Sequence, residues 1–264
     1  MMLPLITMTL LGDAVLILKF SGNLGDNLIA ISMAVVLSLV SALILERFYK
    51  HTAVKFVFIG LIILSLLFTT LNFSLFAGEV MLKGTNTVFP FAVFSALAFY
   101  LGFSPKKVLC KTALVSGTAT ALLIVVITLL SIRFMSAKYL LPHKMPELSA
   151  LGTFLSLYFS LATAFTPILV TVKKRGELIA PTVVFALLFT LCIITTLGHF
   201  GSEYAATLEH PYAVAVSSAA QGEIFSRLDG FFYFFCFFTC LIKSSVCIYA
   251  LRQIYIRLIS KIKS

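Results

Sequence analysis

The sequence predicts an all-α integral membrane protein with about eight transmembrane helices. Of its 264 residues, 60% are hydrophobic and 11% are charged, whereas a soluble domain carries about 25% charged residues. Apolar runs close to the roughly 20 residues that a helix needs to cross the hydrocarbon core recur along the whole chain. These two observations exclude a water-soluble fold. We therefore expect a single polytopic domain over residues 1–264, lying in the lipid bilayer.

The predicted spans are apolar runs bounded by charged residues or turns. They cover approximately residues 3–19, 27–45, 54–77, 86–103, 112–134, 149–172, 178–199 and 229–251. The first span lacks the basic start and the cleavage site of a signal peptide, so we expect it to be retained as a helix. The longest loop, 200–228, has a composition that predicts partly helical structure packed on the bundle.

Basic residues mark alternate loops, which is the pattern of cytoplasmic loops in membrane proteins. The segments 46–55, 104–111 and 173–177 and the C-terminal segment 252–264 each carry three or more Lys or Arg residues. The pattern predicts a multi-pass protein with both termini in the cytoplasm and the loop 200–228 outside. Only the segment 133–147 is discordant, with Arg133, Lys138 and Lys144 on the predicted outer side. The same rule accounts for the net charge of +10, so we expect no nucleic-acid partner.

Two charged residues fall near the centre of predicted spans, where a charge costs about 2.5–3.5 kcal/mol on insertion scales. Asp13 follows Gly12 in the first span, and Lys243 lies just past the middle of the last span. If these two helices pack together, an ion pair would reduce the cost of both charges. A coupling-ion or proton site and a pair that only fixes helix packing are both open interpretations.

Polar stripes at helical spacing predict which helix faces contact protein. In the last span the stripe consists of Cys236, Thr239, Cys240, Lys243 and Cys247, and we expect Phe231, Phe234, Phe235 and Phe238 to face lipid. In the sixth span a weaker stripe of Ser156, Ser160 and Thr163 precedes Pro167. A proline there frees a carbonyl that either lines a site or is satisfied by a nearby threonine hydroxyl.

Signatures of catalysis and of cofactor or metal binding are missing from the sequence. It has no HExxH, GxSxG or P-loop motif, and the four histidines fall in or beside predicted loops. His199 and Glu203 share a spacing that is weak evidence for a metal, and solvated loop residues are the simpler explanation. The five cysteines lie mostly inside apolar runs, which argues against a disulfide framework. We expect neither enzymatic activity nor a cofactor.

Two regions together resemble a known family. The stronger runs from Arg227-Leu228-Asp229 through an aromatic helix to Lys243-Ser244 and Tyr249-Ala250. The weaker joins Leu11-Gly12 to the segment 25–32, which begins Gly25-Asp26. In this order and spacing the chain resembles the spore germination permease family, the membrane-embedded B subunit of germinant receptors. That family belongs to the amino acid, polyamine and organocation transporter superfamily.

The resemblance implies a leucine-transporter-type inverted-repeat fold, truncated here because the chain ends after its eighth predicted helix. In that fold the first, third, sixth and eighth helices form the substrate core. A small amino acid or similar nutrient is the implied ligand, acting at the cell membrane or spore inner membrane beside other germinant-receptor subunits. The implied substrate-binding residues are Gly12, Asp13, Ala14, Ser160 and Thr163. The implied ion-coupling site or buried charge pair consists of Asp13, Lys243, Thr239 and Ser244.

An alternative function is a non-transporting, degenerate permease that serves as a membrane scaffold or receptor subunit. Three departures from the family favour it. The last two helices are missing, a single Gly12 stands where the family prefers a second glycine close by, and Phe159 to Ala162 replace a glycine and glutamate motif. Genes for a receptor A subunit and a lipoprotein beside this gene would favour the receptor function instead.

Overall fold

The computed structural model describes residues 2–12, 14–16, 23–48, 52–78, 88–140, 151–172, 175–219 and 228–262. All regular secondary structure in these ranges is helical. Six of the described helices are long and apolar enough to cross a membrane. They are α2 (Leu24–Phe48), α3 (Thr52–Phe76), α5 (Lys106–Ser131), α7 (Leu151–Thr171), α8 (Ile179–Thr207) and α10 (Leu228–Ile262). The chain is therefore an all-α, multi-pass membrane protein.

Two further apolar helices are shorter than a full span: α1 (Met2–Leu11) and α4 (Val88–Phe103). Each of the eight predicted segments thus contains an α-helix, and α1, α4 and α7 are shorter than predicted. The connections hold the 3-10 turns η2 (Ile132–Phe134) and η4 (Arg175–Leu178) and the short helices α6 (Ala137–Leu140) and α9 (Pro211–Ala219). In the predicted loop 200–228, α8 continues to Thr207, and α9 packs against α8 and α10.

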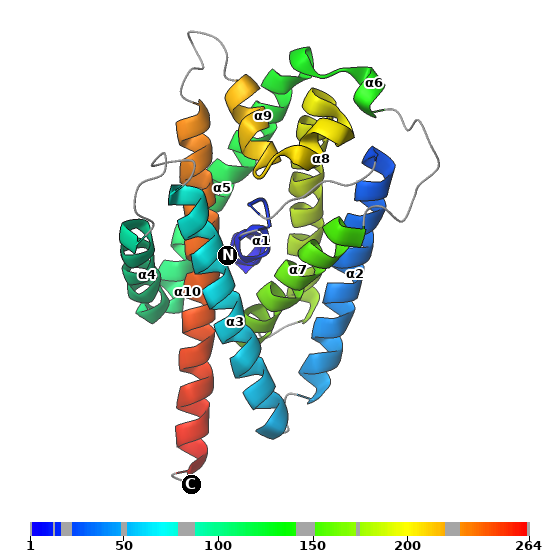
Figure 1. Ribbon diagram of the computed structural model, residues 1–264. Helices are drawn as coiled ribbons and strands as arrows, with labels where there is room; N and C mark the ends of the chain where they lie inside the picture. Colours follow the sequence, from blue (N-terminus) through cyan, green and yellow to red (C-terminus); the bar gives the residue numbers. More distant parts are fainter. Residues whose placement is uncertain are drawn as a thin grey trace.

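Helix α10 is the longest described helix, and most of the other helices pack against it. Its 35 residues extend over about 52 Å at 1.5 Å per residue. It packs against α1, α3, α4, α5, α7 and α9 (Figure 1). Its polar stripe faces these helices, since Cys236, Thr239, Cys240, Lys243 and Cys247 are all buried, as predicted.

The prediction for the phenylalanines of α10 is only partly correct. Phe231 and Phe234 are 64% and 63% exposed on the outer surface. Phe235 is instead 4% exposed and packs against Phe232, with 5.6 Å between the ring centroids. A helix that is surrounded on several sides buries a wider face than its polar stripe indicates.

Helix α1 lies in the middle of the bundle (Figure 1). Its residues Leu5 to Leu11 are all buried, and it packs against α5, α7, α8 and α10 (Figure 1). Ten residues rise about 15 Å, which is half of a hydrocarbon core of about 30 Å. The helix therefore ends near the middle of the bundle.

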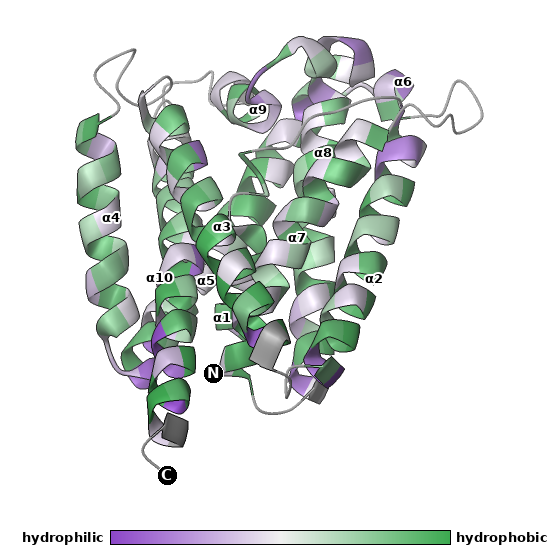
Figure 2. Cartoon of the chain, turned by 60° about the horizontal axis from the view of Figure 1, so that its bottom comes forward, coloured by the Kyte–Doolittle hydropathy of each residue, from purple (hydrophilic) through white to green (hydrophobic). Residues whose placement is uncertain are grey.

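Three of the basic segments meet at the same end of the bundle. Lys106 Nζ donates a hydrogen bond of 2.8 Å to the carbonyl oxygen of Thr171, and Arg252 Nη1 donates one of 2.7 Å to that of Phe103. The same end holds the start of α1, because Cys110 Sγ lies 3.9 Å from Met2 Sδ. Figure 2 shows hydrophilic residues gathered at the two ends and hydrophobic residues between them.

Candidate functional site

The candidate site begins where α1 ends, at Gly12. Gly12 has a φ of +24°, a backbone conformation that glycine adopts with little strain and L-residues rarely adopt. Its N–H donates to the carbonyl oxygen of Met8 (2.9 Å), and the N–H of Ala14 donates to that of Leu11 (2.8 Å). A tight turn thus follows the helix directly. The carbonyl oxygen of Gly12 accepts a bond of 3.4 Å from Cys240 Sγ of α10.

The side chain of Lys243 lies against this turn. Lys243 is 0% exposed, and a Cβ atom added at Gly12 would overlap its Cδ atom. The absence of a side chain at Gly12 is what lets the lysine pass so close. The C-terminal end of a helix carries a partial negative charge, so the end of α1 is a favourable place for the buried ammonium group.

The ammonium group of Lys243 reaches α7 on the other side. Its Nζ donates to the carbonyl oxygen and to the Oγ of Ser160, each at 3.4 Å. Ser160 is fully buried, and its carbonyl oxygen also accepts a bond of 3.0 Å from Thr163 Oγ1. Gly12, Ser160 and Lys243, which are far apart in the sequence, therefore meet at one point where α1, α7 and α10 come together.

Helix α7 runs without interruption past Pro167. The hydroxyl of Thr163 bonds to the carbonyl oxygens of Phe159 (2.9 Å) and Ser160, and that of Thr166 to Ala162 (3.0 Å). The carbonyl that a proline at position 167 frees belongs to Thr163 itself. These threonine bonds go to earlier carbonyls in the same helix, so none of them satisfies the carbonyl of Thr163.

Three buried hydroxyl groups near this junction have no hydrogen-bond partner within the part of the chain that the structure describes. They are Ser65 Oγ and Thr69 Oγ1 of α3 and Ser244 Oγ of α10, and each residue is 0% exposed. Ile62 of α3 and Cys247 of α10 belong to one apolar cluster. Ser65 and Ser244 lie three residues from Ile62 and Cys247 along their own helices. Water or a polar ligand would satisfy these hydroxyls.

The other predicted site residues are buried but make local bonds. Thr239 Oγ1 bonds to the carbonyl oxygen of Cys236 in its own helix (3.0 Å), and Ala14 is fully buried in the turn after α1. Asp13 lies outside the described residues, so its ion pair with Lys243 stays a prediction. Sequence reasoning missed Ser65, although the four-residue spacing of Ser65 and Thr69 in an apolar helix was a usable signal.

The surroundings of the glycines differ among positions 12, 60 and 117. The overlap with Lys243 and the positive φ argue that any side chain at Gly12 costs stability. Gly117 does pack, since a Cβ atom added there would lie 3.2 Å from Met8 Cγ, but Gly60 is exposed with nothing within 4 Å.

The histidine prediction is wrong for His199, which lies inside α8 and not in a solvated loop. Its Nε2 is 2.9 Å from Ser218 Oγ of α9, and its ring packs against Phe134 and Phe200. His199 therefore helps to hold α9 on α8. Within the ranges that the structure describes, no group of three His, Cys, Asp or Glu side chains is placed to hold a metal ion.

Comparisons of the chain with protein-family models, with curated proteins and with solved structures found no match.

Proposed function

We propose that this protein is a transporter-like membrane protein that binds a small polar ligand, such as an amino acid or similar nutrient, at the break after α1. The observation that carries the proposal is the end of α1 at Gly12 in mid-bundle, against the buried Lys243. Interrupted helices at the membrane midplane are where many transporters place substrate and coupling ions. In this function no chemical bond is made or broken.

Contacts among four helices support a transporter-like core. Helix α10 contacts α1, α3 and α7, and α7 also contacts α1 and α3. These are the first, third, sixth and eighth predicted spans, which form the substrate core in leucine-transporter-type folds. The assignment to a fold of that type and to the germinant-receptor family rests on the sequence resemblance.

We assign each site residue a role in this function. Gly12, Asp13 and Ala14 present backbone groups to the ligand, and Ser160 and Thr163 contribute polar groups from α7. Lys243 supplies a fixed positive charge where related folds hold a coupling cation. Ser244 and Thr239 lie beside it on α10.

The convergence of basic segments at one end of the bundle supports an orientation with both termini in the cytoplasm. The bonds from Lys106 to Thr171 and from Arg252 to Phe103 bring three such segments together there. Positively charged loops are retained on the cytoplasmic side. A multi-pass location in the cell membrane or spore inner membrane follows from this orientation and the resemblance.

One observation favours the second candidate, a degenerate permease that acts as a scaffold or receptor subunit. The aliphatic chain of Lys243 fills the space beside Gly12, which is where a ligand would contact the backbone of the turn. If the lysine stays there permanently, the break in α1 only holds the bundle together. In that case the protein would bind partner subunits and no nutrient.

A thermal-shift screen of the detergent-purified protein with amino acids and other small nutrients tests the first candidate. We expect at least one compound to raise the unfolding temperature. The Ser160→Ala variant should weaken its binding about 10- to 100-fold, because a hydrogen bond to a charged group contributes about 1.5–3 kcal/mol.

Ser156→Ala is the matched control for Ser160→Ala. Ser156 lies about one turn away in α7, is half-buried, and bonds to the carbonyl of Thr153 in its own helix. Equal weakening by both variants would place the site elsewhere. No shift with any compound, together with co-purification of other receptor subunits, would favour the scaffold function.

A further inference from the structure

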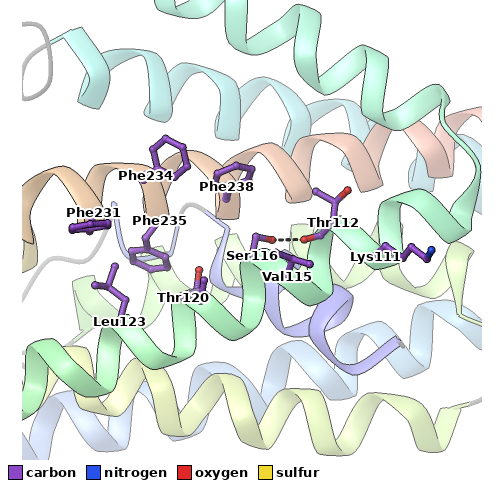
Figure 3. A pocket seen from close by; sticks show the side chains of 11 residues that line it. Lys111, Thr112, Val115, Ser116, Thr120, Leu123, Phe231, Phe234, Phe235 and Phe238 are labelled. Atoms are coloured by element: carbon purple, nitrogen blue, oxygen red, sulfur yellow. Dashed lines mark hydrogen bonds between the residues drawn. The ribbon is translucent and has the colours of Figure 1, made fainter.

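A groove of about 660 Å³ runs along the outside of the bundle between α5 and α10. It is separate from the site at Gly12. Figure 3 shows Phe231, Phe234 and Phe238 of α10 along one side and Val115, Thr120 and Leu123 of α5 along the other. The groove is thus formed by two helices that the fold places in the membrane.

The lining of the groove is apolar and open to the bilayer. Val115 and Phe234 are 71% and 63% exposed, whereas Phe235 is buried in the floor. The hydroxyl of Ser116 is already bonded to the carbonyl oxygen of Thr112 at 2.7 Å. The groove therefore presents mainly hydrocarbon and aromatic surface to whatever occupies it.

One end of the groove is positively charged. Lys111 lines that end (Figure 3), and Lys107 is exposed one turn earlier on the same face of α5. The sequence between residues 88 and 140 contains no Asp or Glu, and the only acidic residue of α10 is Asp229 at its other end. No carboxylate of the two lining helices competes for these lysines.

The dimensions of the groove fit one lipid chain. From Lys111 to Leu123 α5 rises about 18 Å, close to the thickness of one leaflet of hydrocarbon, about 15 Å. The length of the groove therefore matches that of one acyl chain within a leaflet.

We propose that this groove binds one acyl chain of an anionic phospholipid, with the lipid phosphate held by Lys111 and Lys107. The phenylalanines contact the chain, and the ammonium groups neutralise the headgroup, as basic pockets between transmembrane helices do for anionic lipids. The bound lipid then covers the groove between α5 and α10 on the outer surface of the bundle. Lipid binding in this groove depends neither on ligand binding at Gly12 nor on the proposed orientation of the protein in the membrane.

Native mass spectrometry of protein released from nanodiscs with equal phosphatidylglycerol and phosphatidylcholine tests the proposal. We expect the parent to retain phosphatidylglycerol in preference to phosphatidylcholine. Lys111→Gln should lower this preference at least fivefold, because it removes the charge at the groove end. Ala119→Phe, which places a ring in the groove, should reduce the retention of both lipids.

Two matched variants serve as controls. Lys55→Gln removes a lysine on α3, and Leu122→Phe adds a ring on a lipid-facing position of α5 outside the groove. Both variants should retain phosphatidylglycerol and phosphatidylcholine in the same amounts as the parent protein. Unchanged preference in Lys111→Gln would overturn the proposal, and so would equal effects of Lys111→Gln and Lys55→Gln. A covalent dimer formed on mild oxidation of a Val115→Cys variant would overturn it in favour of a second copy of the chain.

Discussion

At the residue scale, the contact between Gly12 and Lys243 explains how a charged side chain is accommodated in the core. A buried charge is costly unless other groups compensate it. Here the lysine stem packs on a position without a side chain, and the ammonium group bonds to Ser160 beside the end of α1. The buried position of Lys243 therefore requires a residue without a side chain at position 12.

Gly12→Ala should destabilise the protein by about 1–3 kcal/mol, the usual cost of overpacking a well-packed core. The new Cβ would overlap Lys243 Cδ and lie 3.0 Å from the carbonyl oxygen of Thr9. Unfolding of the detergent-solubilised protein measures the effect. Gly60→Ala is the control, and it should be neutral or stabilising by up to about 1 kcal/mol, since Gly60 has open space around it in a helix.

A double variant tests whether the overlap with Lys243 is the cause. Lys243→Ala removes the Cδ atom, so Gly12→Ala should cost less in that background than in the parent. Part of the cost should persist, because the positive φ at residue 12 is unfavourable for alanine. If the two losses simply add, Lys243 is not what excludes a side chain at Gly12.

The ion pair that the sequence predicts between Asp13 and Lys243 gives a second prediction at this scale. Lys243→Met and Asp13→Asn should each lower stability, by about 3–5 kcal/mol if the pair is fully buried, because each leaves one charge without its partner. The double variant should recover part of the loss. Unfolding of the four proteins under the same conditions gives the coupling energy, and a coupling near zero would remove the pair from the account.

At the scale of helices, the apolar runs predicted the positions of the helices well. They predicted the residues at which the helices end less well. The first predicted span ran to residue 19, yet α1 ends at Leu11 because the turn at Gly12 is stabilised by contacts with α10. Those contacts join residues more than 200 positions apart, which no local pattern shows. The stripe of α10 was predicted correctly because burial on one helix face leaves a period in the sequence.

For the same reason, the candidate site could be predicted only in part. Lys243 and Gly12 stand out in the sequence as a charge and a possible break inside apolar runs. The bond from Lys243 to Ser160 depends on how α7 and α10 pack. Which hydroxyls lack a partner among the described residues, such as those of Ser65 and Ser244, depends on the packing of α3 and α10. Serine in a transmembrane helix usually bonds to its own backbone, so its presence alone does not mark a site.

The surroundings of Gly102 in α4 and Gly198 in α8 predict how much each helix contact tolerates an added side chain. A Cβ at Gly102 of α4 would lie 2.7 Å from Ile248 Cβ and 3.0 Å from the carbonyl oxygen of Ser245, and neither atom can rotate away. At Gly198 of α8 the nearest atom, 2.9 Å away, belongs to the flexible side chain of Met135. We expect Gly102→Ala to cost about 1–3 kcal/mol and Gly198→Ala clearly less.

Unfolding measurements on these two alanine variants compare the contacts directly. Because α4 lies at the edge of the bundle, against α10 and α3 (Figure 1), Gly102→Ala should also increase hydrogen exchange in α4 relative to α7. Equal stability of the two variants would mean that α4 can shift away from α10 without loss.

At the scale of the whole molecule, the arrangement of the helices decides how the chain can lie in a membrane. All five cysteines of the chain are buried. Cys110, which lies in the basic segment 104–111, is 4% exposed and is therefore a poor target for a thiol reagent. The same burial gives a low background for cysteines introduced at exposed positions.

Two conservative cysteine variants can therefore establish the orientation. Ala206 near the end of α8 and Ser260 near the end of α10 are both exposed and belong to opposite ends of the proposed topology. With both termini in the cytoplasm, Ala206→Cys should react with a membrane-impermeant maleimide in intact cells. Ser260→Cys should react only after the cells are permeabilised. The basic segments joined by Lys106 and Arg252 lie at the end that holds Ser260, so the positive-inside rule requires this result. The opposite labelling pattern would invert the topology and place the start of α1 on the outer side.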